Sequence, residues 1–219
     1  MDKYNADFIN EGRINGILER NQTITNEEFL EIMKKAEAAR GLTMDETAKL
    51  LNLKDADMLR ILFETARRVK EKIYGKRIVL FAPLYVSNYC VNTCTYCGYH
   101  LNSGIARKKL SMEELEQEVI ALERMGHKRI ALESGEDPVN SDIDYIVDCI
   151  RKIYSIKFEN GAIRRINVNI ASTTVDNYKK LKDADIGTYI LFQETYHRET
   201  YGKYPVSYTH LRAHETVLD

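Results

Sequence analysis

The sequence has few prolines, no surplus of basic residues and no long apolar run. Three prolines in 219 residues leave little room for rigid linkers, and there is no internal repeat. Lys and Arg number 32 against 33 Asp and Glu, giving a net charge of −1. Nucleic acid is therefore not expected as the main partner, since phosphate binding needs a basic surplus. No apolar run approaches the roughly 20 residues of a membrane-spanning helix, so we expect no membrane partner.

The N-terminus also lacks the apolar core of a signal peptide, because Met1–Asn5 is polar and leads into no such run. We therefore expect a cytoplasmic protein. Hydrophobic residues make up 44% and charged residues 30% of the chain, which is ordinary for a globular protein. Disulfides are improbable in the cytoplasm, so the four cysteines are interpreted as ligands or core residues.

The pattern of apolar residues changes once along the chain, near residue 77. Residues 1–77 show helical spacing of apolar residues and two helix-start signals, and predict an N-terminal helical region. From Arg77 onward, short apolar runs alternate with amphipathic helices, which predicts parallel β/α units. The expected strands are 78–82, 129–132, 166–170 and 188–192, and the expected helices are about 111–125, 142–154 and 174–181.

The predicted fold class is α/β, a partial parallel (β/α) barrel of about four units. Four units do not close an eight-unit or a six-unit barrel, so residues 78–205 are expected to form a truncated barrel. Residues 206–219 show no clear strand or helix period and are expected to be an artefactual tail, joined to the chain by a sequencing or assembly error.

Three cysteines, Cys90, Cys94 and Cys97, form a C-x3-C-x2-C cluster shortly after the first predicted strand. Three thiolates on one loop can hold three corners of a 4Fe–4S cluster, leaving the fourth iron open to a ligand that chelates through nitrogen and oxygen. The alternative is a zinc site completed by His100. Cys149 is assigned to the apolar face of a helix, and the charge run 107–109 is expected to be solvated.

The cysteine motif, with Tyr96 before its last cysteine, resembles the signature of radical S-adenosylmethionine (SAM) enzymes. Further segments resemble the tyrosine lyase of FeFe-hydrogenase maturation, a relative of the thiamine-pathway 2-iminoacetate synthase. These segments are Leu84–Cys90, Gly126–Arg129, Glu133–Asn140, Gly161–Ile170 and Tyr189–His197.

The resemblance implies a specific reaction. A 4Fe–4S cluster would reduce bound SAM to a 5′-deoxyadenosyl radical, and the Cα–Cβ bond of L-tyrosine would be cleaved to p-cresol and dehydroglycine (2-iminoacetate). In the hydrogenase branch, dehydroglycine is converted further to carbon monoxide and cyanide. The implied partners are L-tyrosine, an electron donor of the flavodoxin or ferredoxin type, and hydrogenase maturation proteins. The alternatives are 2-iminoacetate synthesis for thiamine and a noncatalytic zinc-binding scaffold.

The resemblance also implies cofactor contacts. Ser134, Gly135 and Glu136 match the turn that receives the methionyl amine of SAM, although the same residues would also suit an ordinary strand-to-helix turn. Tyr96 is expected beside the adenine, where a buried aromatic anchor would look the same in sequence.

Two further residues are expected at the mouth of the barrel. Asn169 would meet the ribose or adenine, or would hydrogen-bond a neighbouring strand. Glu194 would bind ribose hydroxyls or the substrate amine, or would support the next helical turn through Arg198. Most tyrosine-binding residues of this family come from later strands, so we expect the 219-residue chain to be inactive alone.

Overall fold

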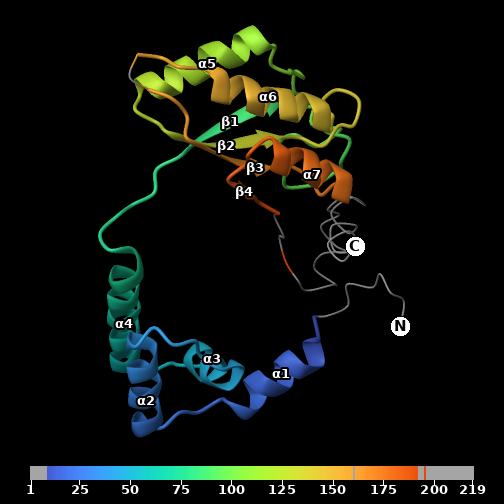
Figure 1. Ribbon diagram of the computed structural model, residues 1–219. Helices are drawn as coiled ribbons and strands as arrows, with labels where there is room; N and C mark the ends of the chain where they lie inside the picture. The colour runs from blue at the N-terminus through green and yellow to red at the C-terminus, as the bar shows by residue number, and fades with distance from the viewer. Residues whose placement is uncertain (1–8, 160, 192–194, 196–219) are drawn as a thin grey trace. The chain divides into compact units, whose positions relative to one another are not determined.

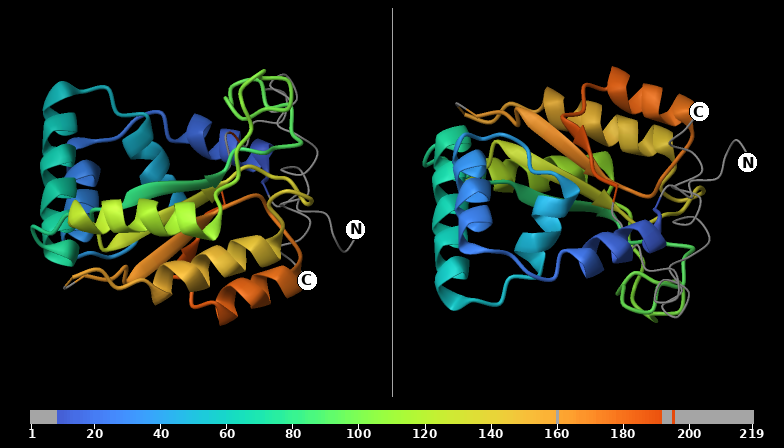
Figure 2. Two further views of the ribbon diagram at one scale, coloured as in Figure 1. Left: turned by 90° about the horizontal axis from the view of Figure 1, so that it is seen from above. Right: turned by 90° about the horizontal axis from the view of Figure 1, so that it is seen from below.

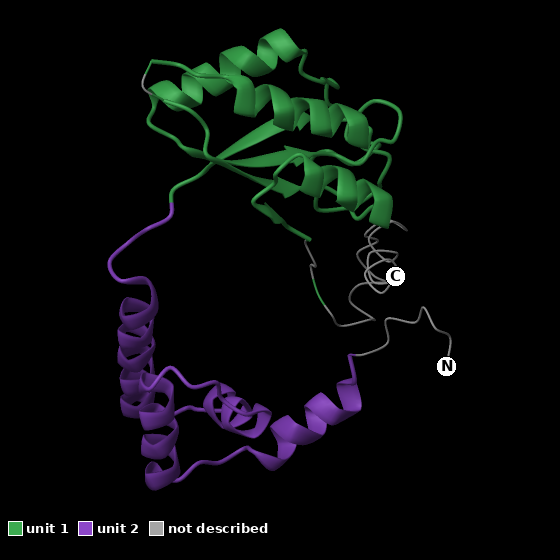
Figure 3. Cartoon of the chain, viewed as in Figure 1, with its two compact units in different colours: residues 1–6, 80–219 green, residues 7–79 purple. Residues whose placement is uncertain are grey.

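The structure is a computed structural model that describes residues 9–159, 161–191 and 195. The chain divides into two compact units between Val79 and Leu80, coloured separately in Figure 3. Each unit has its own apolar core. Within the described ranges, no helix combines the length and the apolar character that crossing a membrane demands.

The unit of residues 7–79, purple in Figure 3, is helical, as the sequence predicts. Thr25 and Thr43 each begin a helix through a capping box, in which the threonine hydroxyl and a glutamate three residues later satisfy backbone N–H groups reciprocally. Phe29, Ile32 and Met33 form the buried core of this unit. Its helices are α1 (Glu11–Arg20), α2 (Asn26–Glu37), α3 (Met44–Leu51) and α4 (Ala56–Tyr74).

The unit that begins at Leu80, green in Figure 3, contains a four-stranded parallel sheet in the order β1-β2-β3-β4, with a helix between each pair of consecutive strands. This arrangement confirms the predicted α/β fold with parallel β/α units. Figures 1 and 2 show the three helices packed along one face of the sheet. The elements are β1 (Ala82–Ser87), α5 (Met112–Arg124), β2 (Arg129–Ser134), α6 (Ile143–Ser155), β3 (Arg165–Asn169), α7 (Val175–Asp183) and β4 (Thr188–Tyr189).

The core of this unit lies between the sheet and its helices. Alternate residues of β2 and β3 (Ile130, Leu132, Ile166 and Val168) are almost completely buried against α5, α6 and α7. Cys149 on α6 belongs to the same core, as predicted, and burial raises the pKa of its thiol to about 11. The opposite face of the sheet carries polar residues of alternate register, among them Asn167 and Asn169.

Two predicted strand ranges are wrong. Residues 78–81 are not in a strand, and β1 begins at Ala82. The apolar run 78–81 lacks the alternation that β1 has, where Ala82, Leu84 and Val86 are buried and Pro83 and Tyr85 are exposed. Burial of one face of a strand, rather than local hydrophobicity, therefore sets the register. The strand β4 ends at Tyr189, although the Ile190 N–H still donates to the Val168 carbonyl at 2.7 Å.

Truncation of Leu132 tests this core. Leu132 is fully buried in β2, so Leu132→Ala should lower the free energy of unfolding by roughly 2–5 kcal/mol, as lost transfer energy and a cavity combine. Urea unfolding followed by circular dichroism measures the change. Val139→Ala, at a side chain that is 83% exposed, is the control and should change stability by less than about 0.5 kcal/mol. Equal effects of the two substitutions would contradict this core.

Candidate functional site

The cysteine loop connects β1 to α5, and both of its ends are fixed. The Leu110 N–H donates to the Val86 carbonyl at 2.9 Å, and Ser87 forms an antiparallel bridge with Lys109. The Tyr145 hydroxyl of α6 lies within hydrogen-bond distance of the Val86 and Leu110 carbonyls, at 3.0 and 2.9 Å. The loop therefore leaves and rejoins the sheet unit at one point, at the carboxyl end of β1.

All three cysteines of the motif lie on this loop, and none of them is in a disulfide. Cys94 is buried and packs against Cys97, whereas Cys90 and Cys97 are half-buried. The Cys97 N–H donates to the Cys94 carbonyl at 3.2 Å, and the His100 N–H donates to the Cys97 carbonyl at 3.2 Å. The second and third cysteines thus bracket one tight turn, and another turn, from Cys97 to His100, follows it directly.

A second turn, at the end of β2, packs directly on the cysteine loop. The Gly135 N–H donates to the Ser87 carbonyl at 3.0 Å, and the Val91 N–H donates to the Glu136 carbonyl at 2.9 Å. The Asn92 amide donates to Glu136 Oε2 at 2.6 Å. Asn92 lies between the first two cysteines and is buried, so one side chain joins the cysteine motif to the carboxylate of the second turn.

Gly135 makes the close approach of these two loops possible. A Cβ atom at this position would lie 2.3 Å from the Tyr89 carbonyl oxygen and 3.0 Å from the Cys90 Cβ atom. Only glycine fits such a contact between two backbones. Ser134 has room for its side chain, and its hydroxyl donates to the Gly135 carbonyl at 2.9 Å.

The two carboxylates of the second turn have different surroundings. Burial opposes ionisation of Asp137, but hydrogen bonds from Asn140 and from the Val139 N–H outweigh it and leave the pKa of Asp137 below its usual value. Asp137 is thus occupied in shaping its own turn. Glu136 is held through one oxygen by Asn92 and lies at the rim of a cavity.

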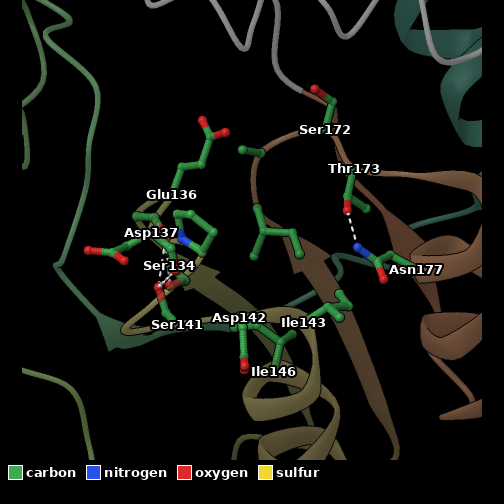
Figure 4. A pocket seen from close by; sticks show the side chains of 14 residues that line it. Ser134, Glu136, Asp137, Ser141, Asp142, Ile143, Ile146, Ser172, Thr173 and Asn177 are labelled. Carbon is green, nitrogen blue, oxygen red and sulfur yellow. Dashed lines mark hydrogen bonds between the residues drawn. The ribbon is translucent and has the colours of Figure 1, made fainter.

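This cavity lies beside the carboxyl ends of β2 and β3 and measures about 320 Å³ (Figure 4). One wall is the turn from Ser134 to Pro138 with the start of α6, and the other is Ile170–Thr173 with Asn177 of α7. Figure 4 shows Glu136 on one side of the cavity and Ser172 and Thr173 on the other. In parallel α/β proteins, ligands bind at this end of the strands.

The wall after β3 is held by residues that the sequence analysis did not select. The Tyr189 hydroxyl lies 2.9 Å from the Ile170 carbonyl and 2.6 Å from the Ala171 carbonyl. The Thr173 N–H donates to the Tyr178 hydroxyl at 3.1 Å, and the Asn177 amide donates to the Thr173 hydroxyl at 2.6 Å. The polar residues Ser172 and Thr173, which precede the Thr174 helix cap, were the available signal for this wall.

Asn169 lies on the sheet face opposite the helices. Its register partner is Glu133, which pairs in turn with Tyr85, and the Asn169 side chain hydrogen-bonds Glu133. Burial raises the pKa of Glu133, and the hydrogen bond from Asn169 opposes this shift. The structure thus shows the neighbouring-strand hydrogen bond that was one of the two expectations for Asn169. Contact with an adenosyl group stays a prediction.

The remaining selected residues divide as follows. Tyr96 is 54% exposed in the turn between Cys94 and Cys97. Glu194 and Arg198 lie outside the described residues, as does the tail 206–219. The charge run 107–109 was wrongly predicted to be solvated throughout. Arg107 is half-buried among backbone carbonyls of the cysteine loop, and Lys109 Nζ lies 4.0 Å above the Tyr145 ring.

The donor set of the loop fits a 4Fe–4S cluster. Among the described residues, no three side chains of the His, Cys, Asp and Glu types form a group that could hold a metal ion. A cubane cluster takes its cysteines on separate irons, so its ligands do not meet at a single ion. Three cysteines outside any disulfide on one anchored loop, with a glycine turn packed against it, suit such a cluster.

The family of the chain follows from comparison with known proteins. A family model described as the radical SAM superfamily matches residues 84–216, which is more than half of the chain. The chain therefore belongs to the radical SAM superfamily. A solved structure of HydG, a maturase of the FeFe-hydrogenase, is similar with a TM-score of 0.89 and 56% identity, over 97% of this chain and 49% of that one.

Further relatives extend the comparison. HydG from Carboxydothermus hydrogenoformans is similar with a TM-score of 0.79 and 40% identity, over 94% of this chain and 47% of that one. The 2-iminoacetate synthase of Salmonella typhimurium is 29% identical over 175 residues, 78% of this chain and 44% of the relative. The 3-methylornithine synthase of Methanosarcina acetivorans is 33% identical, over 74% and 45% of the two chains. The chain thus spans about half the length of these relatives.

The contact between the two loops predicts the effect of a methyl group at position 135. Gly135→Ala places a Cβ against the Tyr89 carbonyl and should lower the free energy of unfolding by about 1–3 kcal/mol, because one backbone must shift. Iron uptake during anaerobic reconstitution should fall as well. Gly98→Ala is the matched control in the same loop, since a Cβ there meets nothing within 4 Å. Wild-type stability of Gly135→Ala would refute the close approach.

The half-buried carboxyl of Glu133 predicts a pH dependence. Its folded-state pKa is raised, so the unfolded chain ionises first and the free energy of unfolding falls as pH rises through the folded pKa. Glu133→Gln removes this effect and should gain stability relative to wild type between about pH 4 and about pH 7. Urea titrations across this range measure the difference.

Glu114→Gln is the control of opposite sign. A hydrogen bond from Lys108 lowers the pKa of Glu114, so this variant should lose stability relative to wild type as pH rises toward the ordinary glutamate pKa of about 4.3, and the difference should stay constant above it; urea titrations extended to lower pH measure this change. Glutamine at this position still serves the capping box of Ser111. If both variants changed with pH in the same direction, the assignment for Glu133 would be wrong.

Proposed function

We propose that this chain serves a radical SAM tyrosine lyase of the FeFe-hydrogenase maturation type. The proposed overall reaction cleaves the Cα–Cβ bond of L-tyrosine to p-cresol and dehydroglycine, on the way to carbon monoxide and cyanide. The observation that carries the proposal is the direct packing of the cysteine loop on the Gly135 turn, in a chain 56% identical to a HydG maturase.

The proposed roles follow from position. Cys90, Cys94 and Cys97 would hold the 4Fe–4S cluster, because they are the three cysteines of the anchored loop. When bound, such a cluster and SAM supply one-electron reductive cleavage of SAM, the source of the radical chemistry. Everything else that this chain contributes is binding, orientation and exclusion of water.

The Ser134–Glu136 turn would receive the methionyl amine of SAM. Asn92 holds one oxygen of the Glu136 carboxylate at 2.6 Å, which fixes the carboxylate at the rim of the cavity and leaves lone pairs for an ammonium group. The Gly135 backbone lies against Cys90, so the amine site and the cluster ligands share one support. Tyr96, Asn169 and Glu194 are the proposed contacts of the adenosyl group.

The proposed partners are L-tyrosine, a reductant of the flavodoxin or ferredoxin type, and proteins of hydrogenase maturation. A cytoplasmic location stays a prediction. A second candidate is 2-iminoacetate synthesis for thiamine, favoured by the relative from Salmonella typhimurium that matches 78% of this chain. The two candidates share the cleavage of tyrosine and differ in what consumes dehydroglycine.

Anaerobic reconstitution of the 219-residue chain tests the cofactor. We expect about four irons and four sulfides per chain, and an electron paramagnetic resonance signal of the reduced cluster that changes when SAM is added. Cys94→Ala should abolish cluster uptake, whereas Cys149→Ala, outside the motif, should retain it. Stoichiometric zinc without sulfide would instead identify a Cys₃His site with His100 and refute the proposal.

A chimera tests the substrate. Residues 1–191 of this chain would replace the matching part of HydG from Carboxydothermus hydrogenoformans, so that the product assay does not depend on the length of the present chain. We expect p-cresol to form only with SAM, tyrosine and a reductant, and not when Cys90 is replaced by Ala. A chimera that forms 5′-deoxyadenosine from SAM but no p-cresol would overturn tyrosine as the substrate.

A further inference from the structure

Arg107 is the most extensively hydrogen-bonded side chain of the described cysteine loop. Its Nη1 donates to the carbonyls of Asn88 and Tyr99 at 2.6 and 2.8 Å. Its Nη2 donates to the carbonyls of His100 and Leu101 at 2.7 and 3.2 Å, and to the Ser103 hydroxyl at 3.1 Å. One guanidinium thus joins the end of β1 to the segment that follows the third cysteine.

These carbonyls belong to a segment without regular structure. Tight turns follow one another here, with N–H donation from Cys97 to Cys94, from His100 to Cys97 and from Ser103 to His100. Carbonyls of such turns have no ladder partner, and half-buried ones need donors from elsewhere. The planar guanidinium of arginine has five N–H donors in a fixed fork geometry and can donate to several carbonyls at once. A lysine ammonium cannot reach carbonyls spread over the same distance.

The backbone that carries Arg107 is itself held against β1. Asn88 donates its backbone N–H to the Lys108 carbonyl at 3.0 Å, and its amide donates to the Ala106 carbonyl at 2.9 Å. The Lys108 N–H donates to Asn88 Oδ1 at 2.6 Å. The residues before and after Arg107 are therefore both hydrogen-bonded to Asn88, which fixes the backbone position from which the guanidinium extends.

The far end of the fork leads back into the cysteine motif. Leu101, whose carbonyl accepts from Arg107, donates its N–H to the Asn92 carbonyl at 2.6 Å. Asn92 lies between Cys90 and Cys94 and holds Glu136. Arg107 therefore contacts the end of β1 directly through Asn88, and is connected through Leu101 to Asn92, the residue that orients the Glu136 carboxylate.

We propose that Arg107 is a positioning residue that holds the cysteine loop in the shape that receives the cluster. The proposal rests on the proposed function for the identity of the bound group, but the anchoring contacts are made entirely within the chain. Arg107 acts on the loop backbone and has no assigned contact with substrate or cofactor. Its loss should free the segment after Cys97 while leaving the sheet and its core intact.

Two variants and a neighbouring control test the proposal. Arg107→Ala removes all five hydrogen bonds, and Arg107→Lys keeps the charge but not the fork. Lys108→Ala is the control, because Lys108 is exposed and its ammonium pairs with Glu114 at 2.8 Å, away from the loop carbonyls. The first measurement is hydrogen exchange of residues 97–104 in the metal-free proteins.

Exchange in this segment should be about tenfold faster in Arg107→Ala than in wild type and in Lys108→Ala, with unchanged exchange in β2 and β3. Arg107→Lys should be intermediate, since one ammonium can serve part of the carbonyl set. Equal exchange in all four proteins would overturn the proposal. This result does not depend on any cluster, so it separates the anchoring from the proposed function.

The second measurement is the rate at which reconstituted proteins lose iron to a chelator. Arg107→Ala should lose iron about tenfold faster than wild type, and the paramagnetic resonance signal of its reduced cluster should be broadened by loop heterogeneity. Arg107→Lys should recover part of both properties. Wild-type iron retention and line shape in Arg107→Ala would overturn the proposal, whereas failure of the wild type to take up a cluster would refute the proposed function instead.

Discussion

The contact between the backbone of Gly135 and the Tyr89 carbonyl is the constraint on which the candidate site depends. Parallel pairing of β1 and β2 brings the loops that follow these strands to one edge of the sheet. Pairing alone would leave two neighbouring loops. The missing side chain at Gly135 lets the second loop lie directly on the first, with hydrogen bonds from Gly135 to Ser87 and from Val91 to Glu136. Thiols and carboxylate thereby become parts of one rigid support.

The support extends outward through side chains that act on backbone. Asn92 orients Glu136, and Arg107 donates to four backbone carbonyls at the end of β1 and in the segment after Cys97. On the other side of the cavity, two hydroxyls hold the segment after β3: that of Tyr178 accepts from the Thr173 N–H, and that of Tyr189 lies at hydrogen-bond distance from the Ile170 carbonyl. A site built on loops needs such contacts because loops have no ladder of their own. The apolar core between the sheet and helices α5, α6 and α7 stabilises the strands from which these loops extend.

The sequence predicted the fold well where a period or a cap was present. The capping boxes of Thr25, Thr43 and Ser111 and the helical period of α6 placed helices correctly. The start of β1 was misplaced because the apolar run 78–81 has the composition of a buried strand, whereas pairing with β2 selects Ala82 to Ser87.

The candidate site was predictable in part. Cysteine spacing indicated the cluster loop, because metal chemistry restricts residue type and spacing. The fork of Arg107 was not predictable, since it depends on where five oxygen atoms lie in space and a run of basic residues is usually solvated. For Asn169, the sequence offered a hydrogen bond to a neighbouring strand as one of two expectations, but its partner Glu133 could be identified only from the register of the two strands.

Tyr145 has a consequence for how this architecture can vary. One phenol on α6 fixes the points where the loop departs from β1 and where it arrives before α5. The two endpoints are therefore set by the scaffold, and the twenty-odd residues between them are free to diverge in chemistry without disturbing the layers below. A loop with both ends fixed in this way is a natural place to graft a foreign ligand-binding segment onto the sheet.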